Sequence, residues 1–309
     1  MARLTTKVLF LIILAIGVYT AFLIFSDISL LTTKFQNFNA LYLPLAFLLV
    51  LASYIVRGMR WDMFLKILKI EIPMKKSFLI FFAGMALGIT PGKFGEVIKS
   101  HFLKRDFSQS VSKTAPIVFI ERFYDLVGIA IISIFGLWLV DIGRIPLFIA
   151  LILMVAALVI SQQRRLLIPL LKKFENISIL KRLGNLSESY GTIQVLLSPT
   201  VYAKGAGYSV AAWIIESIAV YFVFRGFEID LSFPVILLIF TTSSIIGAAS
   251  MLPGGIGITE GGMVGLLSLQ GLDYTTAFTT VLMVRIVTLW YSVIIGLIAL
   301  RMASKTEKN

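Results

Sequence analysis

Six long apolar segments place the tightest limit on what this chain can fold into. They cover residues 8–26, 40–57, 114–140, 146–161, 204–224 and 274–300, and the fourth is short. About 20 apolar residues are enough for a helix to cross a bilayer. The segments do not alternate apolar and polar residues as the strands of a membrane β-barrel do. We therefore predict an all-α polytopic membrane protein with about six spanning helices.

The composition agrees with a membrane protein. Hydrophobic residues make up 58% of the 309 residues and charged residues 14%, whereas soluble domains have about 45–50% and about 25%. A soluble enzyme is therefore excluded. The chain has no cysteine and one histidine, His101, which rules out disulfides and multi-histidine metal sites. We predict no metal site and no cofactor, and we place His101 at the surface.

Two further apolar stretches, 78–105 and 233–270, are interrupted in the middle. The interruptions read Thr-Pro-Gly-Lys-Phe-Gly-Glu at 90–96 and Leu-Pro-Gly-Gly-Ile-Gly-Ile-Thr-Glu at 252–260. Proline and glycine end helices. Irregular backbone at membrane depth is tolerated only where protein or a water-filled cavity covers it. We therefore predict two re-entrant broken hairpins inside the protein.

The distribution of basic residues predicts the orientation. If both hairpins return to the face they entered from and the N-terminus is cytoplasmic, 22 of the 28 lysines and arginines are cytoplasmic, six of them in 57–76 and four in 99–113. Only Lys34, Arg144 and Arg225 then lie outside. Such a bias follows the positive-inside rule. It predicts a multi-pass protein of the cell membrane with both termini in the cytoplasm.

The order of segments repeats along a single transmembrane domain, 1–309. Residues 1–140 and 141–309 both read helix, helix, broken hairpin, helix, and an insertion at 162–203 interrupts the second. Because each half has an odd number of spanning helices, the halves must be inverted. Inverted repeats with broken helices are typical of transporters, with the substrate between the repeats. The insertion reads as a basic amphipathic helix on the cytoplasmic leaflet, either an elbow between the halves or a lipid-binding element.

Two arginines fall inside predicted membrane helices, where a charge is costly. At 1.5 Å per residue, Arg122 lies about 15 Å and Arg285 about 18 Å from the start of its helix, near the middle of a core about 30 Å thick. A guanidinium there could grip a phosphate with two hydrogen bonds. Alternatively, Arg122 pairs with Glu121 or Asp125, whereas no acid lies within four residues of Arg285.

Three more acids need a role at membrane depth. Glu96 and Glu260 follow the two breaks, where each could cap the second half-helix, couple protons or cations, or pair with an arginine. Glu216 lies in the middle of 204–224. It could pair with Arg285 or Arg122, or make a polar contact between helices.

The residues at the tips of the hairpins are also candidates. Lys93 could meet an anionic headgroup or extend to water. The glycines of the breaks are expected to make turns and close backbone approaches, and their N–H groups could also hold a phosphate. These glycines are Gly92, Gly95, Gly254, Gly255 and Gly257.

The two breaks also carry a resemblance to a known family. Gly-Ile-Thr-Pro-Gly-Lys-Phe-Gly-Glu at 88–96, followed by Glu-Arg-Phe-Tyr-Asp at 121–125, resembles the first signature of the lysylphosphatidylglycerol synthase transmembrane region family. Leu-Pro-Gly-Gly-Ile-Gly at 252–257 with Glu260, Arg285 and Trp290-Tyr291 resembles the second. The family includes the flippase part of the bacterial multiple peptide resistance factor and the membrane part of an archaeal dolichyl-phosphate-linked glycosyltransferase. Since the sequence stops at Asn309 without a soluble synthase domain, the resemblance implies lipid movement rather than lipid synthesis.

These observations predict a lipid translocase for an anionic or phosphate-linked lipid, with no nucleic-acid partner. Arg122 and Arg285 would hold the phosphate, Lys93 and the break glycines would line the path, and the membrane acids would balance charge or couple protons. No Gly-x-x-x-x-Gly-Lys-Ser/Thr motif is present, so a gradient must drive transport. The alternatives are a membrane subunit for a separate synthase or glycosyltransferase, or a transferase or phosphatase that uses Glu121 and Asp125.

Overall fold

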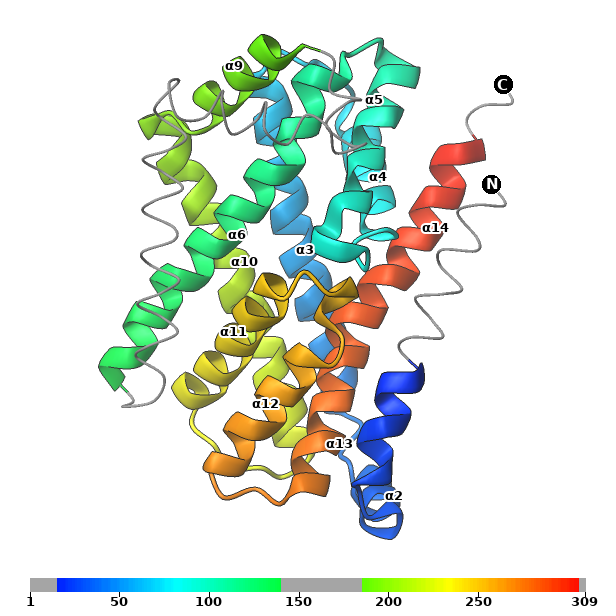
Figure 1. Ribbon diagram of the computed structural model, residues 1–309, viewed down its shortest axis with the longest axis vertical. Helices are drawn as coiled ribbons and strands as arrows, with labels where there is room; N and C mark the ends of the chain where they lie inside the picture. The colour runs from blue at the N-terminus through cyan, green and yellow to red at the C-terminus, as the bar shows by residue number, and fades with distance from the viewer. Residues whose placement is uncertain (1–15, 140–184, 306–309) are drawn as a thin grey trace.

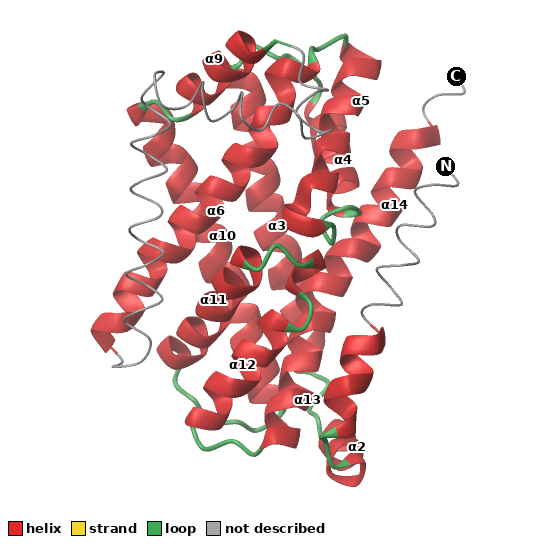
Figure 2. Ribbon diagram, viewed as in Figure 1, coloured by secondary structure: helices red, strands yellow, loops and turns green. Residues whose placement is uncertain are grey.

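Helices make up nearly all of the chain that the structure describes, which is a computed structural model covering residues 16–139 and 185–305. Short loops join these helices, and no strand occurs in those two ranges (Figure 2). The predicted spanning segment 146–161 and most of the predicted amphipathic insertion lie outside the described residues. The described end of the insertion is a short helix, α9 (Leu186–Leu196), at one end of the bundle (Figure 1).

Long helices form the frame. They are α3 (Tyr42–Ile67), α6 (Val111–Leu139), α10 (Pro199–Gly226) and the continuous run of α13 (Tyr274–Arg285), η4 (Ile286–Trp290) and α14 (Tyr291–Lys305). Within the described ranges, three helices are long and apolar enough to cross a membrane: Tyr42–Ile67, Pro199–Gly226 and Tyr274–Lys305. The predicted all-α polytopic membrane fold is confirmed.

The chain bends sharply where the first apolar segment ends. Its described part, Ile16–Ile24, meets α2 (Ile28–Gln36) at an angle of 108°. The bend is fixed by Asp27, whose Oδ1 accepts hydrogen bonds from the backbone N–H groups of Ser29 and Leu30 at 2.9 and 3.1 Å. Asp27 N donates in turn to Thr275 Oγ1 at 3.0 Å, which ties the bend to α13.

Both predicted breaks occur, and each one reverses the chain. The first lies between α4 (Met74–Met85) and α5 (Ile98–Phe107) and contains the 3₁₀ helix η1 (Pro91–Val97). The second lies between α11 (Phe233–Ala249) and α12 (Ile258–Leu269) and contains η3 (Pro253–Gly255). The two hairpins enter from opposite ends of the bundle, and η1 contacts η3 midway along it (Figure 1).

The backbone conformation at both tips favours glycine. Gly92 and Gly254 have φ values of 55° and 60°, a region that side chains with a Cβ rarely occupy. Lys93 shares this left-handed conformation, with φ 56°, which is uncommon for a residue other than glycine. The prediction that the glycines make the turns is therefore met at these positions.

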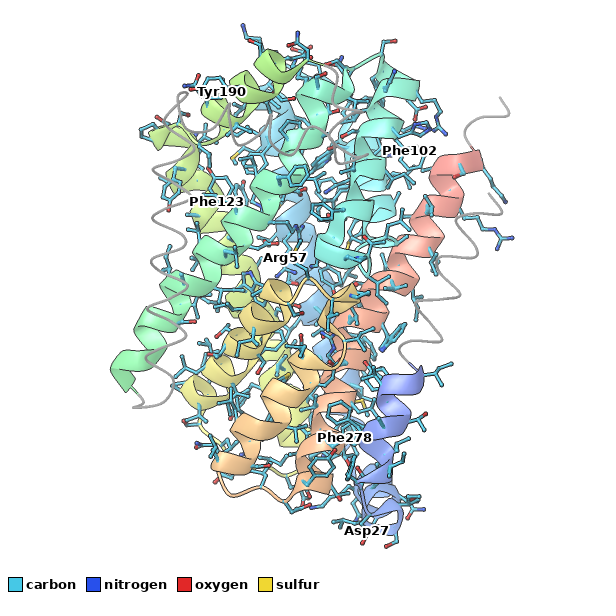
Figure 3. The ribbon with its side chains drawn as sticks, viewed as in Figure 1. Asp27, Arg57, Phe102, Phe123, Tyr190 and Phe278 are labelled. Atoms are coloured by element: carbon cyan, nitrogen blue, oxygen red, sulfur yellow. The ribbon has the colours of Figure 1, made fainter. Side chains whose placement is uncertain are left out.

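Two apolar clusters hold the hairpins against the long helices. One, toward the end that contains α2, includes Val50, Phe224 and Phe278. The other, toward the end that contains α9, includes Trp61 and Phe81. Phe278 and Phe102 lie near these two ends in Figure 3.

Helix α14 also approaches α4 very closely. A Cβ added to Gly296 would overlap the backbone nitrogen of Ala86. Only glycine at this position therefore allows α14 to pack against the end of the first hairpin.

Three basic residues that the charge count assigns to the cytoplasm lie inside the bundle instead. Arg60 and Lys99 are fully buried, and the side chain of Arg57 is 12% exposed. The predicted cytoplasmic tally falls accordingly from 22 to 19. For Arg57 and Arg60 the error arises because α3 continues as one helix to Ile67, ten residues beyond the apolar segment that ends at 57. Lys99 lies instead in the first turn of α5, directly after the first break.

Candidate functional site

The buried cations of α3 face acids on the neighbouring helices. The Nη2 atom of Arg57 lies 2.7 Å from Glu216 Oε2 on α10, and the Arg57 guanidinium also lies 4.9 Å from the centre of the Trp213 ring. Ser53 Oγ donates to the same carboxylate at 3.5 Å. Arg57 is labelled midway along the bundle in Figure 3. Of the two alternatives for Glu216, the polar contact between helices is the one that the structure shows, with Arg57 rather than Arg122 or Arg285 as its cation.

One turn further along α3, Arg60 binds α6 and α10. Its Nη2 lies 2.9 Å from Asp125 Oδ1, and its Nη1 donates to Ser209 Oγ. Since Arg60 is fully buried and Asp125 is 8% exposed, neither charge can rely on water. Each therefore depends on the other for its stability in the interior.

Arg122 links this pair to the first break. Its Nη1 lies 2.9 Å from Asp125 Oδ2, three residues along the same helix, as the spacing predicts. Its Nη2 lies 3.3 Å from Glu96 Oε2 at the end of η1. The side chain of Arg122 stays 25% exposed beside the hairpin tip, whereas its Nε atom is buried without a hydrogen-bond partner.

Lys99 closes the network on the far side of Glu96. Its Nζ lies 3.1 Å from Glu96 Oε2 and 2.5 Å from Glu121 Oε2, and both Lys99 and Glu121 are fully buried. The ammonium also lies 4.6 Å from the centre of the Trp61 ring. Glu121 therefore pairs with Lys99 from the first hairpin rather than with its neighbour Arg122.

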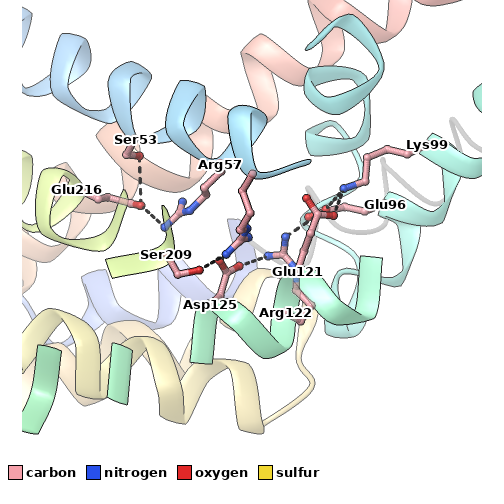
Figure 4. Close-up of polar contacts among 10 residues, drawn as sticks. Ser53, Arg57, Glu96, Lys99, Glu121, Arg122, Asp125, Ser209 and Glu216 are labelled. Carbon is pink, nitrogen blue, oxygen red and sulfur yellow. Dashed lines mark hydrogen bonds and ion pairs between the residues drawn. The ribbon is translucent and has the colours of Figure 1, made fainter. Parts of the chain in front are cut away.

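Together these contacts form a charge network across the middle of the bundle, shown in Figure 4. Its charges balance, because four cations face four acids. The cations are Arg57, Arg60, Lys99 and Arg122, and the acids are Glu96, Glu121, Asp125 and Glu216. Lys93 lies at the tip of the same break, is exposed, and has no carboxylate partner in residues 16–139 and 185–305. The first break therefore presents one surplus positive charge.

The second break has a more enclosed pair. Arg285 Nε donates to Glu260 Oε1 at 2.7 Å, and its Nη2 donates to the carbonyl oxygen of Gly254 at 2.5 Å. Tyr19 donates to the same carboxylate at 3.1 Å, and Gly257 N donates to Glu260 Oε2 at 2.7 Å. Glu260 thus caps α12 and holds Arg285 at the same time. Of the roles considered for Glu260, pairing with an arginine and capping of the second half-helix both occur, and Arg285 thereby gains a carboxylate partner 25 residues earlier in the chain.

Arg122 and Arg285 therefore occupy corresponding places at the two breaks. Each binds the acid that follows a break, Glu96 in the first and Glu260 in the second. Each guanidinium contacts the hairpin of its own half of the chain. That the two arginines hold one phosphate together stays a prediction.

Three of the five break glycines donate backbone hydrogen bonds within the breaks themselves. Gly95 N donates to Thr90 Oγ1 at 2.7 Å, and Gly255 N donates to the Leu252 carbonyl at 3.0 Å. Gly257 N binds Glu260. These three glycines therefore stabilise the turns, and their N–H groups are not available to a phosphate in this conformation.

Four residues of this region were not predicted from the sequence: Arg57, Arg60, Lys99 and Tyr19. A charge inventory could have indicated the first three, because the membrane acids outnumber the two arginines assigned to membrane helices. Buried acids need nearby cations, and the nearest unassigned ones in the sequence are in 57–60 and at 99. His101, by contrast, is exposed as predicted.

Comparison with known proteins identifies the family. The family model described as the lysylphosphatidylglycerol synthase TM region matches residues 12–296. The chain therefore belongs to this family, and the expected resemblance is confirmed. No solved structure matches it significantly.

Archaeal relatives match most of the chain at low identity. A UPF0104 membrane protein of Methanocaldococcus jannaschii is 25% identical over 68% of this chain and 90% of its own length. UPF0104 membrane proteins of Methanothermobacter thermautotrophicus and Pyrococcus horikoshii are 24% and 25% identical, over 85% and 82% of this chain and 85% of their own lengths. The chain is thus similar over 68–85% of its length to UPF0104 membrane proteins.

Proposed function

We propose that this member of the lysylphosphatidylglycerol synthase transmembrane region family is a lipid translocase of the cell membrane. It would move an anionic or phosphate-linked lipid between leaflets. Membership of a family described by a lipid synthase supports a lipid-related role in the membrane. The observation that carries the finer proposal is the meeting of two broken helices midway along the bundle, each with an acid–arginine pair at its break.

The first break offers the phosphate contact. Lys93 is exposed there and Arg122 is 25% exposed, whereas the rest of the network is neutral. An ammonium and a guanidinium that share one surplus positive charge favour a group with one negative charge, such as a phosphodiester. The acyl chains would remain in the bilayer while the headgroup passes the tips.

The carboxylates would respond to the headgroup. A phosphate at Arg122 competes with Glu96, which has Lys99 as a second partner at 3.1 Å. Glu96 can therefore release Arg122 without losing all of its charge compensation. The same exchange offers a place to couple proton or cation binding, since an acid that loses a cation partner binds protons more readily.

Movement of the two halves of the chain would give the lipid path alternating access to the two leaflets. We treat residues 1–140 and 141–309 as inverted repeats whose hairpins face opposite leaflets. Rocking one hairpin past the other at the η1–η3 contact would open the path first to one side and then to the other. The partner-subunit alternative differs in requiring a separate synthase or glycosyltransferase before the lipid moves.

Reconstitution in liposomes tests the proposal. Purified protein is placed in vesicles that carry fluorescent phosphatidylglycerol or phosphatidylcholine, and the labelled lipid that reaches the outer leaflet is quenched. Lys93→Gln should lose most phosphatidylglycerol transport while folding normally, whereas Lys75→Gln, an exposed lysine on α4, should keep it. Transport that starts only with an added synthase supports the partner role, and a chemically altered lipid supports an enzyme. Absence of all three refutes the proposal.

A further inference from the structure

A second lipid contact lies away from the breaks, in a groove between α3, α10 and the start of α4. The groove has a volume of about 480 Å³, within the range of about 300–1,000 Å³ that small-molecule sites occupy. It combines an apolar wall with two lysines. Its lining residues are Met59, Asp62, Met63, Lys66, Ile67, Met74, Lys204 and Tyr208.

We propose that this groove binds one anionic phospholipid of the surrounding leaflet by its headgroup phosphate and glycerol. Lys66 and Lys204 would contact the phosphate, and the methionines would contact the glycerol and the upper acyl chain. This inference concerns binding at the edge of the bundle and does not depend on transport through the middle.

The charges favour an anion. Asp62 lies 2.8 Å from Lys66 and holds its ammonium at the groove, although 67% of the Lys66 side chain remains exposed. Lys204 lies on α10, is exposed, and has no acid partner in the described parts of the chain. The groove therefore carries a net charge of one positive unit, which matches a phosphodiester headgroup.

The depth also fits a lipid. Met59 to Ile67 covers the last 12 Å or so of α3 at about 1.5 Å per residue, and α3 is long and apolar enough to cross a membrane. The groove therefore reaches from the outer hydrocarbon to the headgroup layer, which adds about 5–8 Å on each side of the core. A soluble ligand would not need the apolar wall at this depth.

The wall suits an acyl chain rather than a rigid partner. Met59 and Met74 are 40% and 56% exposed, which is an unfavourable arrangement for apolar side chains in water and a favourable one against lipid. Methionine is flexible and polarizable, so it adapts to chains of different shape. Both ends of the proposed ligand thus have a matching surface in one groove.

Lipid titration of the protein in neutral detergent tests the assignment. The readout is the rise in melting temperature with dioleoyl-phosphatidylglycerol or dioleoyl-phosphatidylcholine, together with the number of bound lipids by native mass spectrometry. The wild-type protein should bind phosphatidylglycerol more tightly than phosphatidylcholine. Lys204→Gln should weaken that binding roughly fivefold, the effect of about 1 kcal/mol for one basic residue at a membrane surface.

A matched control and a second variant keep the test decisive. Lys104→Gln removes the same charge from α5 at the same end of the bundle and should leave the affinity unchanged. Met63→Trp fills the groove without changing its charge and should weaken binding even if Lys204→Gln folds poorly. Equal affinity in Met63→Trp and wild type overturns the proposal.

If a soluble phosphate ester or a second copy of the chain fills the groove, the experiments give different results. Competition by soluble glycerol phosphate at millimolar concentration would show a phosphate-ester site rather than a lipid site and would overturn the assignment. A wild-type dimer that Met63→Trp converts to monomer, with lipid binding unchanged, would show that a second copy of the chain fills the groove, which also overturns it.

Discussion

The Arg285–Glu260 pair gives the sharpest test of how the second break is held. If it is a structural lock, Arg285→Met should destabilise the protein strongly, because Glu260 is fully buried and would keep its charge without a cation. Removing one partner of a buried ion pair costs about 3–5 kcal/mol. The two charged hydrogen bonds that Arg285 donates, at 2.7 and 2.5 Å, account for a loss of that size at about 1.5–3 kcal/mol each.

A double variant distinguishes the interaction between Arg285 and Glu260 from the separate effects of replacing each residue. Glu260→Gln keeps an oxygen that can accept from Gly257 N and so retains the cap on α12. Arg285→Met combined with Glu260→Gln buries no unpaired charge, and replacement of a whole buried pair by neutral groups is often close to neutral in stability. We therefore expect the double variant to be more stable than Arg285→Met alone, with a coupling free energy of about 2–3 kcal/mol.

The assay is reversible unfolding by denaturant in mixed micelles, followed by tryptophan fluorescence. The matched control is Arg225→Met, which removes one partner of the exposed Arg225–Asp230 pair at 2.8 Å. Exposed pairs contribute about 0–1 kcal/mol, so this variant should unfold close to wild type. If Arg285→Met unfolds within about 0.5 kcal/mol of wild type, or the two single effects add in the double variant, the lock does not exist.

Three further predictions concern the frame around the site. Lys99→Met should cost about 3–5 kcal/mol because it leaves Glu121 buried without its cation; adding Glu121→Gln should restore part of the loss in the same unfolding assay, and full additivity would contradict the pairing. Gly296→Val should lose about 1–3 kcal/mol through overlap with Ala86, whereas Gly207→Val, which meets open space, should lose less than half as much. Despite desolvation, hydrogen bonds from Thr276 hold the pKa of Asp273 below its ordinary value. The stability that Asp273 contributes as the cap of α13 is therefore present above the unfolded pKa and is lost as pH falls through the folded pKa. Asp273→Asn should keep the cap and reduce the loss of stability between pH 6 and pH 3, and an unchanged pH dependence would refute the assignment.

Sequence patterns were sufficient wherever the decisive interaction is local. Proline and glycine at 91–92 and 253–255 interrupt apolar stretches, and the chain reverses at both places. Arg122 and Asp125 are three residues apart on one helix and do pair. These features depend on neighbours within a few residues, which a single sequence displays directly.

Interactions between distant segments were beyond the same reasoning. Arg60 pairs with Asp125 across 65 residues, and Arg57 with Glu216 on another helix. No spacing rule connects such positions, because the pairing follows from how α3 and α6 both pack against α10. Arg57 and Arg60 also follow directly on an apolar segment, so a hydropathy pattern assigns them to the loop that comes next.

The π-helical turn η4 after Arg285 was equally hidden. Its sequence, Ile-Val-Thr-Leu-Trp, contains no proline or glycine. The widened turn changes the local hydrogen bonding, and Tyr54 from α3 donates to the Thr288 carbonyl at 2.6 Å. A tyrosine more than 200 residues away is thus part of what stabilises this local irregularity, and π-turns of this kind are frequent at functional sites.

The two breaks differ in a way that matters for the proposed transport. At the first, Arg122 is 25% exposed and the exposed Lys93 adds an uncompensated charge. At the second, the side chains of Arg285 and Glu260 are 10% and 0% exposed, and Tyr19 donates a hydrogen bond to the carboxylate.

A phosphate would therefore bind at the first break at lower cost in free energy, since the side chains that would contact it there are already partly exposed. Binding at the second would require Glu260 to give up Arg285, at a cost similar to that of breaking a buried pair. On the proposed function, the halves are thus unequal: the first hairpin receives the headgroup, and the second holds its shape until the protein changes conformation.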